Sequence, residues 1–185
     1  MLEVSIEIAG GYKLTSLRAS DSPGLVRCLG DGEIASLIPT IPRPYGEAQA
    51  HAWIEHRSRF LEHSGREISF AIRRPDGTLI GSVGVDDYAV GSTSSAELGY
   101  WVARDARRAG VAHAALRSFL QYAFRTLELE RIIARTIVAN EPSSRLLEDL
   151  GFAREGILRR FTRIGEAFHD TLVFGLLRED FTSTP

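Results

Sequence analysis

The chain has 185 residues, of which 44% are hydrophobic, and this is enough for a single domain with its own core. A formal net charge of −2 favours neither nucleic acid nor an anionic membrane as a partner, since both attract clustered positive charge. Cys28 is the only cysteine, so an intrachain disulfide is excluded. Residues 1–11 lack the basic flank of a signal peptide, and no apolar run reaches the ~20 residues that span a bilayer. We therefore expect one cytoplasmic domain over 1–185, with a frayed tail at 182–185.

Hydrophobic spacing and turn residues divide the chain into alternating strands and helices, and no repeat or linker suggests an internal boundary. A helix is expected after Ser20-Asp21-Ser22-Pro23, because Ser or Asp accepts hydrogen bonds from first-turn amides and proline needs no donor there. Alternating residues around the turn Pro75-Asp76-Gly77 predict a hairpin. The expected strands are 11–18, 68–72, 79–85, 96–102, 131–138, 153–163 and 166–177, and the expected helices follow 20–23, cover 46–63, follow 104–107 as far as 127, and cover 141–150.

The most informative segment passes from a strand through a tight loop into a helix. Here Arg107-x-x-Gly110-x-Ala112 places small residues just before the helix, where unpaired N–H groups and the positive end of the helix dipole suit a pyrophosphate. Gly110 has no Cβ to obstruct a ligand, and Arg107 and Arg108 would donate charge-assisted hydrogen bonds to phosphate oxygens. Taken alone, the loop is equally compatible with a plain connection.

Two motifs in this order resemble the GNAT acetyltransferase superfamily. The Arg-x-x-Gly-x-Ala loop at 107–112 is similar to its acetyl-CoA pyrophosphate loop. The Asn-x-x-Ser segment that continues to Gly-Phe, at 140–152, is similar to the matching part of the RimJ/RimL-like branch, the ribosomal-protein alanine N-acetyltransferases. The resemblance extends over 14–177 and includes Asp170 after the last turn.

The resemblance implies an α/β (α+β) GNAT fold. This fold is a central mixed, mostly antiparallel twisted sheet of about seven strands flanked by about four helices, with a cofactor cleft between the fourth and fifth strands. It implies acetyl-CoA as acyl donor and no metal ion. Asn140, followed by proline, is also expected to cap its helix. The residues expected to bind the cofactor are Tyr100, Trp101, Val102, Arg107, Arg108, Ala109, Gly110, Val111, Ala112, Asn140 and Ser143.

Glu97 is the candidate general base, since an amine attacks a thioester only when neutral. It lies on the strand that the resemblance places beside the acetyl group, in an otherwise apolar stretch that would make a carboxylate a stronger base. A plain carboxylate on an exposed strand face is the alternative. By analogy with the family, a backbone N–H near Trp101 or Val102 would stabilise the oxyanion. Ser143 would hydrogen-bond or protonate the departing sulfur, because the tyrosine that many members carry is absent from 140–152; helix capping is its alternative role.

The expected reaction takes place in a ternary complex, in which a primary amine attacks the acetyl-CoA thioester directly. The expected amine is the N-terminal α-amine of a protein or peptide. Acylation of a small-molecule amine is the first alternative, and a non-catalytic acyl-CoA sensor is the second. The chain is expected to be a monomer or homodimer. In the family the acceptor groove lies between the first two helices and the final hairpin, so Tyr45 and Phe161 are candidate wall residues. The arginines at 159, 160 and 163 would either attract an acidic acceptor or form a solvated face.

Overall fold

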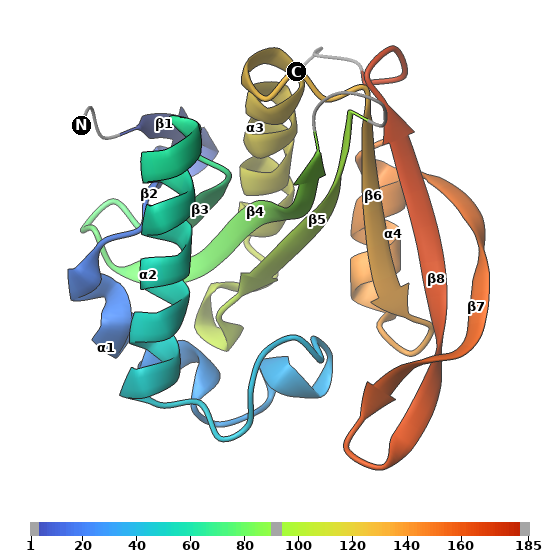
Figure 1. Cartoon of the computed structure of the whole chain (residues 1–185), viewed down its shortest axis with the longest axis horizontal. Helices are drawn as coiled ribbons and strands as arrows, with labels where there is room; N and C mark the ends of the chain where they lie inside the picture. Colours follow the sequence, from blue (N-terminus) through green and yellow to red (C-terminus); the bar gives the residue numbers. More distant parts are fainter. Residues whose placement is uncertain (1–3, 90–93, 182–185) are drawn as a thin grey trace.

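The computed structural model describes residues 4–89 and 94–181, and in this part the chain forms one eight-stranded sheet with four α-helices (Figure 1). The strand order is β1-β2-β3-β4-β5-β6-β8-β7, and every neighbouring pair is antiparallel except β5 and β6. The expected tail at 182–185 lies outside the described residues. The strands are β1 (Ser5–Ile8), β2 (Tyr12–Ser16), β3 (Ser69–Arg73), β4 (Leu79–Ala89), β5 (Ser95–Val102), β6 (Arg131–Ile137), β7 (Ala153–Ile164) and β8 (Ala167–Leu177).

Two helices pack on each face of the sheet, and each face has its own core (Figure 1). The larger core lies under α3 and α4 and includes Phe70, Phe119 and Phe174. The smaller core lies under α1 and α2 and includes Leu25 and Trp101. The helices are α1 (Ser22–Leu29), α2 (Glu47–Ser64), α3 (Val111–Thr126) and α4 (Glu141–Asp149), and short 3₁₀ turns are η1 (Ala9–Gly11), η2 (Ala19–Asp21), η3 (Ile34–Ser36) and η4 (Arg104–Ala106).

The sheet has eight strands where about seven were expected. The additional strand is β1, whose four residues pair with β2 in the register Ser5↔Thr15 to Ile8↔Tyr12. Only Ile8 is buried in it. Such a short edge strand has too few apolar residues to produce a clear alternating pattern, and it is held by main-chain hydrogen bonds to its neighbour.

The sheet opens between β5 and β6. Their parallel pairing runs from Ser95↔Arg131 to Leu98↔Ala134 and ends there, whereas the pairing of β5 with β4 continues as far as Val102. The backbone of Gly99 to Val102 therefore has no strand partner on its β6 side within the described residues. These two strands correspond to the expected segments 96–102 and 131–138, so the split lies where the cofactor cleft was expected.

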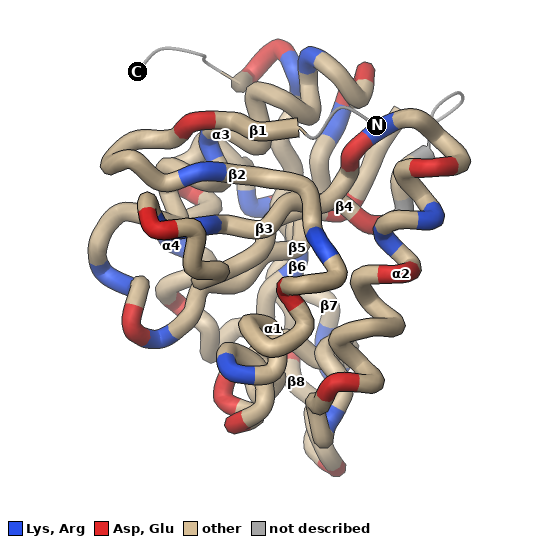
Figure 2. Tube along the Cα trace, turned by 90° about the vertical axis from the view of Figure 1, so that its left-hand side faces the viewer, with Lys and Arg blue, Asp and Glu red and all other residues tan. Residues whose placement is uncertain are grey.

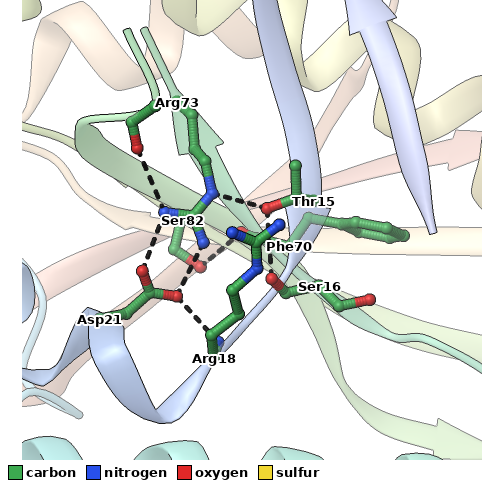
Figure 3. Close-up of polar contacts among 8 residues, drawn as sticks. Thr15, Ser16, Arg18, Asp21, Phe70, Arg73 and Ser82 are labelled. Atoms are coloured by element: carbon green, nitrogen blue, oxygen red, sulfur yellow. Dashed lines mark hydrogen bonds and ion pairs between the residues drawn. The ribbon is translucent and has the colours of Figure 1, made fainter. Parts of the chain in front are cut away.

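Asp21 has a different role from the helix cap expected of it. No hydrogen bond joins its side chain to the α1 amides. Instead its carboxylate oxygens accept two hydrogen bonds of 2.8 Å from the Arg73 guanidinium and one of 2.8 Å from the Arg18 N–H, while Arg73 Nε donates to Thr15 Oγ1 at 2.7 Å (Figure 3). This buried ion pair joins β2, β3 and the start of α1.

Both signs of charge are interspersed along the trace on the side of the molecule that carries α1 and α2 (Figure 2). Within the described residues, none of the helices is both long enough and apolar enough to cross a membrane.

Candidate active site

A cavity of about 1090 Å³ occupies the split between β5 and β6. It is bounded by the loop into α3, the first turn of α4, the β7–β8 hairpin and the loop that follows α1. Most of the residues expected at the site line it. They are Glu97, Tyr100, Trp101, Val102, Arg107, Arg108, Gly110, Val111, Ala112, Asn140 and Ser143.

The loop before α3 presents free backbone amides to this cavity. None of the N–H groups from Arg108 to His113 donates a hydrogen bond to another described residue, and the helical ladder starts with Ala114 N donating to Gly110 O at 3.0 Å. Unpaired amides at the positive end of a 16-residue helix can bind a diphosphate. The residues present thus fit the pyrophosphate of a CoA-type ligand.

Gly110 gives this loop a left-handed turn, with a φ of +72°. A Cβ built there would meet no protein atom of the described residues within 4 Å. Arg108 also has a positive φ, of +62°. Two left-handed residues turn the loop tightly enough to point successive N–H groups outward.

The two arginines of the loop have different surroundings. Arg107 donates from Nε to Val102 O at 3.0 Å and from its terminal nitrogen to Glu33 Oε1 at 3.0 Å. Glu33 also accepts from Arg104 Nε at 2.8 Å, and the hydrogen bonds from Arg104 and Arg107 hold the pKa of the Glu33 carboxyl below its usual value. Arg108 is exposed and has no polar partner among the described residues. Of the two, Arg108 has the guanidinium with no protein partner in the described part of the chain, whereas that of Arg107 is largely engaged by Val102 and Glu33.

Three of the expected cofactor residues turn their side chains into the cores. Trp101 is 8% exposed and packs among α1 and α2, while Val102 and Val111 are buried beneath α3. They can therefore meet a ligand chiefly through the backbone. Tyr45, a candidate wall residue, is also buried in the smaller core and is not among the cavity residues, whereas Phe161 lines the cavity.

Tyr100 and Ser143 meet across the split. Their hydroxyl oxygens are 2.7 Å apart, and burial raises the pKa of Tyr100 to about 12 against the lowering effect of its hydrogen bond to Ser143. Asn140 caps α4, as expected, because its Oδ1 accepts from Ser143 N at 3.4 Å. The sequence analysis looked for a tyrosine on the last helix, and the structure supplies one from β5.

Glu97 has surroundings that differ from the apolar ones expected. Arg135 of β6 donates from Nε to Glu97 Oε1 at 2.8 Å and contacts the second carboxylate oxygen with its terminal nitrogen. The ring of Phe161 lies 5.2 Å from the Arg135 guanidinium carbon. The carboxylate is thus fixed in a two-pronged ion pair that is one-quarter exposed on the Glu97 side and opens into the cavity.

Sequence analysis missed three groups at the cavity margin. These are Arg135, the Asp86 that lies opposite Glu97 in the sheet and pairs with Arg57, and the Glu33 that binds Arg107. No group of His, Cys, Asp and Glu in the described residues is placed to hold a metal ion.

The open α/β sheet thus splits at a parallel pair, with free helix amides on one side of the split and an oriented carboxylate on the other. This arrangement is suited to a phosphate-bearing ligand. This chain belongs to the GNAT acetyltransferase family. The family model for the "Acetyltransferase (GNAT) domain" matches residues 13–153. The resemblance drawn from the two sequence motifs is confirmed.

Relatives with curated names share about a third of their residues with the chain. The "Putative ribosomal N-acetyltransferase YdaF" of Bacillus subtilis is 33% identical over 106 residues, which cover 57% of each protein. The match thus spans little more than half of that relative's length. The "Probable N-acetyltransferase YjcK" of the same organism is 33% identical over 67% of this chain and 72% of its own. The "[Ribosomal protein uS5]-alanine N-acetyltransferase" of Escherichia coli is 29% identical over 64% and 61%.

Solved structures agree in fold at lower identity. The ribosomal-protein-S5-alanine acetyltransferase of Vibrio fischeri aligns with a TM-score of 0.85 at 19% identity, covering 97% of this chain and 99% of its own. Mycobacterium smegmatis RimJ, solved in complex with CoA-disulfide, aligns with a TM-score of 0.79 at 22% identity, covering 96% and 87%. Both therefore share the fold of this chain.

Proposed function

We propose that this chain transfers an acetyl group from acetyl-CoA to the N-terminal α-amine of a protein or peptide, by direct attack in a ternary complex. The observation that carries the proposal is the convergence of three groups on one cavity: the free amides of 108–113, the Glu97 carboxylate and the Tyr100–Ser143 hydroxyl pair. The names of relatives, among them a ribosomal-protein alanine N-acetyltransferase, support the same activity.

On the donor side, bound acetyl-CoA supplies an activated thioester carbonyl. The amides of 108–113 and the Arg108 guanidinium hold its diphosphate. The backbone of Gly99 to Val102, which has no strand partner on its β6 side among the described residues, orients the arm that carries the thioester. A backbone N–H near Trp101 or Val102 stabilises the negative charge that develops on the carbonyl oxygen. These contacts need no movement of a buried side chain.

Ser143 and Tyr100 act on the departing sulfur. Ser143 donates its hydroxyl proton toward the sulfur, and Tyr100 donates to Ser143 Oγ, which orients that proton. Because the pKa of Tyr100 is about 12, the phenol keeps its proton at neutral pH. Its part is therefore to position Ser143, and the thiolate takes its final proton from the serine or from water.

On the acceptor side, Glu97 receives the proton of the attacking amine. Arg135 orients the Glu97 carboxylate toward the cavity, and an acceptor amine that is already partly neutral needs the least help from a base. With a pKa of about 8, roughly a tenth of α-amines are neutral at pH 7, whereas fewer than about one in a thousand lysine amines are, with a pKa of about 10.4. This contrast supports an N-terminal α-amine over a lysine or an aliphatic polyamine.

The test is a panel of acceptors assayed for release of the CoA thiol, with the products located by mass spectrometry. The panel contains peptides with free N-termini, the same peptides with blocked N-termini and an internal lysine, and small amines including polyamines. Acetylation at free N-termini is expected. Acetylation of small amines alone would establish the small-molecule alternative, and binding of acetyl-CoA without thiol release from any acceptor would establish the sensor.

A further inference from the structure

An exposed cluster of aromatic and arginine side chains lies on the β7–β8 hairpin. We call Arg160, Phe161, Arg163 and Phe168 the hairpin patch. The two rings are 51% and 49% exposed, an unusual degree for large apolar side chains. The guanidinium carbons of Arg160 and Arg163 lie 5.8 Å and 5.9 Å from the centre of the Phe168 ring, so the two arginines flank one ring.

The hairpin patch is continuous with the cavity. Phe161 and Arg163 are among the residues that line the cavity, together with Glu97. The Phe161 ring also contacts the guanidinium of Arg135, the partner of Glu97. A polypeptide whose terminal amine lies at Glu97 has this surface along its path out of the cavity.

The charge of the patch is positive and uncompensated. Residues 156–165 contain three arginines and no acidic residue, in a chain whose net charge is −2. Within the described residues neither Arg160 nor Arg163 forms an ion pair with a carboxylate. The Asp170 carboxylate accepts the backbone N–H of Arg160, not its guanidinium, at 2.8 Å. Arg163 Nε donates to Gly165 O at 2.9 Å, and this leaves the two terminal nitrogens of Arg163, together with the Arg160 guanidinium, for hydrogen bonds to carboxylates.

We propose that the hairpin patch binds Asp or Glu side chains that follow the acceptor's N-terminal residue, and so selects polypeptides with an acidic N-terminal segment. This inference rests on the proposed function, because it requires the acceptor to be a polypeptide. An extended chain advances about 3.3 Å per residue, so the acidic positions lie within the first several residues. The aromatic rings contact the apolar parts of the same segment.

Two matched peptide series test the inference. Both begin with alanine and differ only in that positions 3 to 8 carry either Asp and Glu or Asn and Gln. The expected result is a kcat/KM about tenfold higher for the acidic series at low salt, with the ratio falling as NaCl is raised. The double variant Arg160→Gln/Arg163→Gln should bring the ratio close to one, and Arg160→Glu/Arg163→Glu should reverse the preference toward a Lys-containing series.

Arg154→Gln is the matched control, because it removes the same charge from the same strand at a residue that neither lines the cavity nor contacts Phe168. It should keep the acidic preference of the parent protein. Acetyl-CoA affinity and thermal unfolding of each variant verify that the chain remains folded, and the ratio of the two series remains informative even where absolute rates fall.

Three results would overturn the inference. Equal kcat/KM values for the acidic and neutral series would do so while leaving the proposed function in place, since both peptides would still be acetylated at their N-termini. If the preference for the acidic series survives in both double variants, other residues must cause it. A parent protein that is dimeric, with dimerisation lost on Phe168→Ser, would show that a second copy covers the patch. Failure to acetylate any peptide would instead refute the proposed function itself.

Discussion

The Tyr100 hydroxyl on β5 lies 2.7 Å from the Ser143 hydroxyl at the start of α4, so a hydrogen bond spans the mouth of the split between the two halves of the sheet. Ser143 is also held from below, because its N–H donates to the Asn140 cap. Ser143 is thus held by Tyr100, 43 positions earlier in the chain, and by Asn140, three positions earlier.

Tyr100→Phe should lower kcat about tenfold with little change in the Kd of acetyl-CoA, because it removes one hydrogen bond from Ser143 and no backbone contact. Ser143→Ala should cause a similar or larger loss, and the double variant should lose no more than Ser143→Ala alone. Since the pKa of Tyr100 is about 12, the pH profile of kcat below pH 9 should keep its shape in Tyr100→Phe. Additive losses in steady-state kinetics would show that the two hydroxyls act separately.

Glu97→Gln should lower kcat by about 10² to 10⁴-fold, the usual range for a general base, while calorimetry finds acetyl-CoA binding nearly unchanged. The substitution keeps the shape of the side chain, so the neighbouring strand should stay in register. Glu62→Gln, an exposed residue on α2, is the control for a lost negative charge and should keep full turnover. Unaltered turnover in Glu97→Gln would show that solvent, and not Glu97, takes the proton of the attacking amine.

Arg108→Gln should weaken acetyl-CoA binding about tenfold, with the loss shrinking as salt rises, because Arg108 has the available guanidinium. Arg107→Gln should act differently, through the loop that its bonds to Glu33 and Val102 support. Glu33→Gln should therefore reproduce much of the Arg107→Gln effect, and the two should not add in titration calorimetry. Equal, additive and salt-dependent losses of acetyl-CoA affinity in the Arg107 and Arg108 variants would show that both side chains bind the phosphate.

Asp21→Asn should destabilise the fold by about 3–5 kcal/mol in urea unfolding, because it leaves the buried Arg73 guanidinium without its counter-charge. Replacing both partners, as Asp21→Leu/Arg73→Met, should recover most of the loss, since the penalty comes from the unpaired charge. Glu55→Gln breaks the exposed pair with Arg59 and should leave the unfolding midpoint unchanged. A neutral result for Asp21→Asn would mean that water reaches Arg73.

Glu67→Gln should raise the free energy of unfolding at neutral pH. Burial raises the pKa of Glu67 above its ordinary value of 4.5, against hydrogen bonds from Ser16 and the Ser69 amide that lower it. The protonated form therefore stabilises the folded chain at low pH, and this contribution is lost as pH rises through the folded-state pKa. The advantage of Glu67→Gln in urea unfolding should accordingly be largest at pH 7.5 and vanish near pH 4. An advantage that does not vary with pH would exclude ionisation of Glu67 as the cause.

Local sequence determined most of the elements of this protein. The period of apolar residues predicted α3 to within a residue at its C-terminal end, and Asn140 with Pro142 predicted both the start of α4 and the cap that the structure confirms. Gly110 and its small neighbours marked the tight loop before α3. These features depend on interactions within a few residues, so a single sequence is enough to predict them.

Tertiary structure decided what each of these groups meets. Asp21 turned from a predicted cap into a buried partner of Arg73, and Glu97 turned from a carboxylate in an apolar stretch into one bound by Arg135, 38 positions away. Sheet register sets such pairs, and register is fixed by the packing of whole strands, not by local spacing. The chain's sequence therefore indicated most of the candidate site residues, while their pairing, including the hydrogen bond between Tyr100 and Ser143, depends on where the pairing of β5 with β6 ends and on the position of α4.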